Sequence, residues 1–204
     1  MNILLECRDN LYREGMIYIL TQIFSNDRDK RVYFTTGSDN VKIAKSDIIV
    51  YHLAAGEASM CHRSFLNLRP ETLLIGIYDG ESHPFIHELP YCFKNMIFIG
   101  RINKLHDIIK LIERSWEGCK PESEFSRTPP CIRCKHRQLS SRQMEIAAQL
   151  ISGKGTAKIA KEMGMKDKAI SANKRMIMSR FNLKNNVELF AFLTHLKTRG
   201  ILPS

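Results

Sequence analysis

The sequence predicts two domains: an α/β domain built on a doubly wound parallel sheet, followed by an all-α domain of four helices. Short apolar runs alternate with helical patterns through residues 1–117, whereas every element in residues 138–204 has a helical pattern. The segment between them, residues 118–137, carries prolines and polar side chains without periodicity, as a linker does. Charge is also divided unevenly between the two parts, which supports the same boundary.

Five short apolar runs are the expected strands of the sheet. They lie at residues 2–6, 31–35, 47–52, 72–77 and 96–99. Between them, residues 11–24 and, more strongly, residues 105–116 carry apolar side chains at helical spacing, and residues 58–68 form a weaker candidate helix. Because strands that alternate with helices favour β-α units, we expect the strands to be parallel.

Four helices are expected in the C-terminal domain, at about residues 140–152, 156–163, 167–181 and 186–196. Ser140 or Ser141 can cap the first helix, which ends near Gly153. Thr156 is expected to cap the second helix, which ends at Gly164. Apolar side chains at helical spacing can close a small core. The expected core residues are Ile146, Ala147, Leu150, Ile159, Ala160, Met163, Ile170 and Ile177.

The positive charge is concentrated in the C-terminal third of the chain. The net charge is +10, from 31 Lys and Arg against 21 Asp and Glu. Residues 1–126 carry 15 basic and 17 acidic side chains, whereas residues 127–204 carry 16 and 4. This asymmetry predicts that the C-terminal domain faces a polyanion; a solvated charged face is the alternative interpretation.

A spaced set of residues in the C-terminal domain carries a family pattern. Its members are Leu139, Arg142, Glu145, Gly153, Lys154, Ile159 and Ala160, continued by Ile170, Lys174, Ile177, Phe181 and Leu183. Residues 139–195 resemble, without a gap, the C-terminal DNA-binding domain of the LuxR/FixJ family. Many spaced matches are more specific than one short motif. The resemblance implies a helix-turn-helix domain that binds double-stranded DNA.

The resemblance also implies which residues face DNA. The third helix would enter the major groove with one outward face near the base edges, formed by Lys168, Ser171, Ala172 and Arg175. The phosphate backbone would be held by helix N-termini and by basic residues of the domain. We expect Lys154, Lys158, Lys174 and Arg180 at the backbone, with Lys166 also in the DNA-binding set.

Four positions depart from the family pattern. Lys166 replaces the usual Ser, so Asp167 is expected to cap the third helix, and Asn173 and Met176 replace the usual His and Asn. Ala169 replaces the usual Thr, whose hydroxyl is a phosphate contact, so weaker DNA affinity is expected. The chain looks closest to the auxiliary RcsA, BglJ and YjjQ branch of enteric regulators. That branch implies either a homodimer or a heterodimer with an RcsB-like regulator.

The fourth helix presents the surface through which the family dimerises. By this resemblance, Val187, Phe190, Ala191 and Leu193 would lie on an exposed face and contact a second chain. The alternative is that these apolar side chains are ordinary core of a small domain.

The N-terminal domain resembles a response-regulator receiver. The resemblance is clearest at Leu11-Tyr-Arg-Glu-Gly-Met and at Ser46-Asp-Ile-Ile-Val-Tyr-His. A working receiver holds Mg²⁺ with paired acids after its first strand. Those positions fall here on about Cys7 and Arg8. Without the acids, no cation site is expected.

The phosphate chemistry of a receiver is also expected to be absent. The phosphoacceptor Asp falls on His52, and the Lys that contacts the phosphoryl group falls near Arg101. Without the Asp, the acyl-phosphate nucleophile is missing. We therefore expect a pseudo-receiver used for partner contact. His52 as a phosphoacceptor is an alternative to His52 as a structural or exposed residue.

A cysteine cluster lies in the linker. Cys131, Cys134 and His136 are closely spaced, and Cys119 precedes them. Thiolates and an imidazole at short spacing can bind Zn²⁺, and a basic setting can make a Cys-x-x-Cys pair redox-active. The alternative is inert, reduced cysteines, and we expect no metal and no cofactor.

Several classes of protein are disfavoured. The N-terminal residues do not resemble a signal peptide, and no apolar run has the length of a membrane span, so a cytoplasmic protein without membrane contact is expected. Neither Gly-x-Ser-x-Gly nor a Gly-rich phosphate loop occurs, so an enzyme is not expected. The leading hypothesis is a phosphorylation-independent transcription regulator of surface-structure genes such as fimbriae or capsule. The alternative is a modulator that heterodimerises and contacts DNA little.

Overall fold

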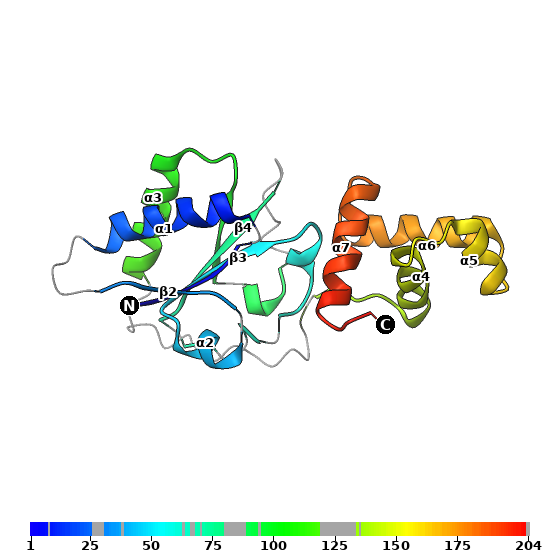
Figure 1. The fold of residues 1–204 in the computed structure, drawn as a ribbon, viewed down its shortest axis with the longest axis horizontal. Helices are drawn as coiled ribbons and strands as arrows, with labels where there is room; N and C mark the ends of the chain where they lie inside the picture. Colours follow the sequence, from blue (N-terminus) through cyan, green and yellow to red (C-terminus); the bar gives the residue numbers. More distant parts are fainter. Residues whose placement is uncertain are drawn as a thin grey trace. The chain divides into compact units, whose positions relative to one another are not determined.

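The computed structural model describes residues 1–7, 9–25, 31–37, 39–62, 64–65, 68–69, 71–79, 89–93, 95–118, 134 and 136–202. The chain divides into two compact units. Unit 1 comprises Met1–Leu53 and Cys61–Lys135, and unit 2 comprises Ala54–Met60 and His136–Ser204. Figure 1 shows a sheet flanked by helices in the first unit and a group of helices in the second.

Unit 1 is built on a five-stranded parallel sheet with the strand order β2-β1-β3-β4-β5. This order is typical of one class of doubly wound α/β folds, so the predicted fold class is confirmed. The central strands are almost wholly buried, because helices cover both faces of the sheet. The strands are β1 (Asn2–Glu6), β2 (Tyr33–Thr35), β3 (Ile48–Leu53), β4 (Leu73–Tyr78) and β5 (Met96–Gly100).

Helices α1 (Asn10–Phe24) and α3 (Leu105–Gly118) cover one face of this sheet, and α2 (Asn40–Lys45) lies on the other face (Figure 1). Apolar side chains from α1 and α3 share one core with the inward side chains of β1, β3 and β4. At its edge the rings of Phe24 and Trp116 meet edge-on, with centroids 5.3 Å apart.

The helix predicted over residues 58–68 is wrong. Among the described residues of that range, helical backbone is limited to a short 3-10 helix, η1 (Glu57–Ser59), at its start and to 3-10 conformation at Ser64 and Phe65. The reason is that the segment is divided between two cores. Met60 is buried in the core of unit 2, whereas His62 and Phe65 stack in unit 1 with ring centroids 5.1 Å apart. One helical face cannot serve both cores.

Unit 2 contains the four predicted helices around one core. They are α4 (Ser141–Ile151), α5 (Thr156–Glu162), α6 (Asp167–Arg180) and α7 (Asn186–Thr198). The predicted core residues are buried in a single cluster, apart from Met163, which is only partly buried at its edge. Phe181, Leu183 and the inner face of α7 complete the cluster, so the small domain is closed by helix-helix packing.

The helix starts follow capping chemistry, with two corrections. Ser140 forms a capping box with Gln143, in which each side chain bonds the backbone N–H of the other residue. Thr156 does not cap α5; Gly155 occupies the cap position and Thr156 is already helical. Asp167 likewise lies inside α6, and the cap position belongs to Lys166, which makes no capping bond.

Unit 2 also includes the segment Ala54–Met60, which the sequence had assigned to the N-terminal domain. Glu57 is fully buried there and accepts a hydrogen bond from His195 Nε2 at 2.7 Å. Arg199 lies 3.8 Å from the same carboxylate, so the buried charge has a cationic partner. Within the described residues, no helix combines the length and the apolar character that crossing a membrane requires.

Candidate nucleic-acid interface

Helices α5 and α6 form a helix-turn-helix. The turn between them uses Gly164 with φ of +62°, a left-handed conformation that favours glycine. The N–H of Met165 donates to the carbonyl of Ala160 at 2.8 Å and closes the turn. Ile159 and Ile170, both fully buried, anchor the two helices to the same core. The turn and the core together fix which face of α6 is left for solvent.

That outer face of α6 carries the residues predicted to lie near base edges. Lys168 and Arg175 are exposed, and Ser171 and Ala172 between them are partly exposed. Their spacing of three and four residues places them on adjoining positions of one helix surface. The opposite face of α6 is buried through Ile170 and Ile177. The structure therefore brings these four predicted residues together.

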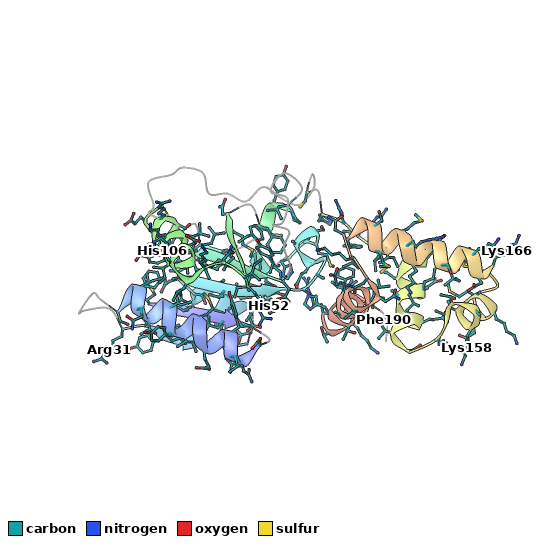
Figure 2. The ribbon with its side chains drawn as sticks, turned by 90° about the horizontal axis from the view of Figure 1, so that it is seen from above. Arg31, His52, His106, Lys158, Lys166 and Phe190 are labelled. Atoms are coloured by element: carbon teal, nitrogen blue, oxygen red, sulfur yellow. The ribbon has the colours of Figure 1, made fainter. Side chains whose placement is uncertain are left out.

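Six basic side chains on α5, on α6 and at the turn between them have no bonded partner among the residues that the structure describes. They make no hydrogen bond and no ion pair with any other residue that the structure describes. Figure 2 shows two of them, Lys158 from α5 and Lys166 at the start of α6, at the same end of this unit. We call this set the unpaired cations: Lys158, Lys161, Lys166, Lys168, Lys174 and Arg175.

Lys154 differs from this set because it has acidic and polar partners inside unit 2. Its ammonium group pairs with Glu162 and also lies 3.4 Å from Gln149 Oε1. The hydrogen bond from Lys154 lowers the pKa of Glu162 below its usual value. Lys154 thus ties the end of α5 to the region that follows α4, and its charge is already balanced.

Arg180 is also engaged within unit 2. Its guanidinium donates to the carbonyl of Gln138 at 2.7 Å, and its own carbonyl accepts a hydrogen bond from Arg137. These two hydrogen bonds hold the end of α6 against the residues that precede α4. Arg180 remains exposed, so its predicted phosphate contact would come in addition to this structural contact.

Two departures from the family pattern have visible consequences on α6. The Asn173 amide donates to the carbonyl of Ala169 at 2.9 Å, one turn earlier, so it is directed along its own helix. Lys166 provides no side-chain cap, so the first N–H groups of α6 are left to solvent or to an anion. Asp167 in the first turn adds a negative charge there.

The predicted dimerisation surface is only partly exposed. Val187 and Phe190 are 78% and 41% exposed, and Ala191 lies beside them on the same face of α7. Leu193 was expected on this face, but that expectation is wrong: it is fully buried with Phe192 in the core. Positions 187, 190 and 191 share a face at three- and four-residue spacing, whereas position 193 lies farther round the helix, on the side that packs into the core.

At the carboxyl edge of the sheet in unit 1, one arginine is paired with two carboxylates. The Arg101 guanidinium lies 2.5 Å from Asp9 and 3.3 Å from Asp79. It also lies over the ring of Tyr12 at 5.2 Å. A hydrogen bond from the Tyr12 backbone N–H, followed by that from Arg101, lowers the pKa of Asp9 below 3.8. Arg101 therefore neutralises both nearby carboxylates.

The residues that replace the receiver chemistry lie at the same edge. His52, near the end of β3, contacts Asp79 through Nε2 at 3.1 Å. Cys7 follows β1 and is buried, and burial raises the pKa of its thiol to about 11. A thiol with that pKa stays protonated at neutral pH and is a poor metal ligand. Arg8 lies outside the described residues.

The cysteine cluster is only partly described. Cys119 and Cys131 lie outside the described residues. The Cys134 sulfur accepts a hydrogen bond from the Tyr91 N–H at 3.3 Å in unit 1, and His136 belongs to unit 2. In the described part of the chain, no three His, Cys, Asp or Glu side chains are grouped as metal ligands would be.

Sequence reasoning missed several residues of these surfaces. Asp9 and Asp79 reach one edge of the sheet although 70 positions separate them along the chain. The alternation of strands and loops could have indicated this, because the carboxyl ends of parallel strands meet at one edge. Lys161 follows Lys158 by three residues on α5 and was not among the residues predicted to contact DNA.

Comparison with known proteins agrees with this architecture. Residues 137–193 match the model of the family described as "Bacterial regulatory proteins, luxR family". No curated protein sequence gives a significant match to the chain.

Solved structures similar to the chain include RcsB response regulators. RcsB of Salmonella enterica serovar Typhimurium, bound to promoter P1flhDC, has a TM-score of 0.57 at 15% identity, over 95% of this chain and 97% of that one. The two-component response regulator RcsB in a DNA complex has a TM-score of 0.51 at 14% identity, over 95% and 98%. Two RcsB dimers bound to two parallel DNAs give 0.51 at 15%, also over 95% and 98%. At such identities the likeness shows the fold alone: a receiver-like α/β domain followed by a helical domain in one chain.

Proposed function

We propose that this protein is a transcription regulator that binds double-stranded DNA through unit 2. The observation that carries the proposal is the set of unpaired cations on the helix-turn-helix. Cations without internal partners contribute little to folding but can neutralise phosphates and release counterions from DNA. The outer face of α6, with Lys168 and Arg175 at its two ends, has the size and charge that the major groove accommodates.

The similar structures support a DNA ligand. They include RcsB bound to DNA, RcsB bound to a promoter and RcsB dimers bound to parallel DNAs. By analogy, the exposed Val187, Phe190 and Ala191 are a surface for a second chain, which is either a copy of this protein or an RcsB-like regulator. Dimers place two reading helices on two half-sites of the duplex.

The regulator acts without phosphorylation in this proposal. The supporting observation is the pairing of charges at the carboxyl edge of the sheet in unit 1, where a receiver holds its metal ion and phosphoryl group. There Arg101 already neutralises Asp9 and Asp79, and the position of the phosphoacceptor is His52. An incoming phosphoryl group or Mg²⁺ would have to displace this ion pairing. We extend the same proposal to a cytoplasmic protein with no cofactor and no catalytic activity.

The likeness to the RcsA, BglJ and YjjQ branch suggests target genes for surface structures such as fimbriae or capsule.

One observation favours the second candidate, a modulator that acts mainly through a partner. Leu11 and Ile102 are 86% and 74% exposed beside the Asp9–Arg101 pair, and Leu105 is exposed as well. Contiguous exposed apolar side chains often mark a protein contact.

A fluorescence anisotropy titration separates the two candidates. The full chain is titrated onto labelled random-sequence duplex at low salt, first alone and then with an RcsB-type regulator. The proposed function predicts that the chain alone binds the duplex. The double variant Arg175→Ala with Lys168→Ala should bind the same duplex with lower affinity. The variant Arg142→Ala is the matched control, because Arg142 is exposed but paired with Glu145. Binding only in the presence of the partner would favour the modulator.

A further inference from the structure

Met176 is an exposed apolar side chain on the outer face of α6. It is 55% exposed, although Ile177 beside it is fully buried and Met178 packs against the core. The core of unit 2 therefore does not use Met176. A single exposed methionine is ordinary on a protein surface, whereas one that continues an apolar strip can mark a contact.

The neighbours of Met176 form an apolar strip between cations. Ala172 lies one turn earlier on the same side of α6, and its methyl group is partly exposed. Arg175 is adjacent to Met176 and exposed, and Lys168 lies one turn before Ala172. Thus methyl groups and cations share the surface that the proposed function assigns to the major groove.

The major groove offers one apolar feature, the 5-methyl group of thymine. Alanine and other apolar side chains contact this methyl group, whereas Arg and Lys bond the acceptors of guanine. We infer that Ala172 and Met176 contact thymine methyl groups, so that the preferred duplexes carry thymine at the positions facing this strip. The inference rests on the proposed function and specifies its ligand: duplex DNA whose thymines are read through their methyl groups.

Exchange of thymine for uracil removes only the methyl group and leaves the pairing edge unchanged. Preferred duplexes are first selected from a random pool with the full-length protein. Each thymine of the selected duplex is then replaced, one at a time, by deoxyuridine, and affinity is measured by anisotropy. Burial of one methyl group predicts a loss of about fourfold at each contacted position.

Variants of the protein assign the methyl contact to Met176. In Met176→Gln, the loss at one contacted position should disappear, so thymine and uracil bind equally there. Lys158→Gln is the matched control: it should weaken both duplexes by the same factor and keep the fourfold ratio. Because Met176 is exposed, Met176→Gln should also leave the thermal midpoint unchanged.

The outcomes separate the inference from the proposed function. If the full chain selects no duplex, the proposed function fails and the inference fails with it. If duplex binds but no thymine is sensitive to uracil exchange, the inference alone is overturned. If the sensitivity persists in Met176→Gln, the assignment to Met176 is overturned. A fourfold ratio that Met176→Gln abolishes at one position supports the inference.

Discussion

The protein contains two arginines in contrasting settings. One lies at the carboxyl edge of the sheet in unit 1 and is paired with carboxylates, and the other lies on the outer face of α6 in unit 2 without such a partner among the described residues. Arg101 is held by two carboxylates and stacks on Tyr12, so its charge is satisfied inside the protein. Arg175 is exposed on its helix and has no acidic partner among the described residues. The same side chain is therefore a structural element in one unit and an available ligand group in the other.

This difference explains how the two units divide their tasks. An internal ion pair makes a surface indifferent to external anions, because binding one would break the pair. An unpaired cation gains most from a polyanion, because the polyanion supplies the missing partner and releases counterions. Substitution of the unpaired cations in unit 2 should therefore lower DNA affinity, whereas substitution of Arg101 or its partners should lower the stability of unit 1.

The largest expected effect is that of salt on DNA affinity. About five phosphate contacts per chain predict that affinity falls about 10²–10³-fold between 50 and 200 mM salt. Anisotropy titrations at several salt concentrations give the slope of log affinity against log salt. Replacement of Lys158 and Lys174 by Gln should reduce that slope by about two. A slope that is the same in this variant would show that these side chains do not contact phosphate.

The next largest effect compares the two arginines directly. Arg175→Ala should weaken binding to a preferred duplex about ten- to a hundredfold, as loss of one base contact does. It should weaken binding to unrelated duplex less. Arg101→Ala should leave both affinities unchanged, since its charge is already neutralised. Equal losses on preferred and unrelated DNA would argue against base recognition by Arg175.

A smaller effect is expected on the stability of unit 1. Arg101→Ala leaves Asp9 and Asp79 close together without their shared cation, so the thermal midpoint should decrease by a few degrees. Because both carboxylates are partly exposed, the decrease should shrink in high salt. Differential scanning calorimetry measures it, and Arg175→Ala serves as the control that should not change the midpoint. An equal decrease in both variants would contradict the comparison.

The smallest expected effect is the dependence of stability on acid. The pKa of Asp9 lies below its usual 3.8 in the folded protein, so its contribution is present above that pH. The contribution is lost as the pH falls below 3.8 through the folded pKa. Asp9→Asn should therefore destabilise the protein at pH 6 more than at pH 3 in urea unfolding. An equal effect at both pH values would show that the charge of Asp9 does not matter.

The sequence predicted what depends on local pattern. Runs such as Ile48–Leu53 are mostly apolar because a parallel strand is buried on both faces, so each strand was located to within two residues. Ser140 was one of the two predicted caps of the first C-terminal helix, and it caps α4 through a capping box with Gln143. The short helix α2 was missed, because six residues with only Ile43 buried give no periodic signal.

What the sequence could not provide are partners that folding brings together. Lys154 was placed in the DNA-binding set, and only the folded structure reveals its pairing with Glu162 across the length of α5. The hydrogen bond between Glu57 and His195 joins residues 138 positions apart, which no spacing rule anticipates. Composition gives the number of cations, but only the fold separates those that are paired from those that are available.

The central claim is that the unpaired cations of unit 2 carry DNA binding, and a charge-matched comparison tests it most directly. One full-length variant combines Lys158→Gln, Lys168→Gln and Arg175→Gln; the other combines Lys104→Gln, Lys110→Gln and Arg114→Gln around α3 of unit 1. Both lose the same charge. At 50 mM salt, the first should bind duplex DNA at least about a hundredfold more weakly than the unaltered chain, and the second should bind nearly as well. Equal losses in the two variants, or no binding by the unaltered chain, would contradict the account.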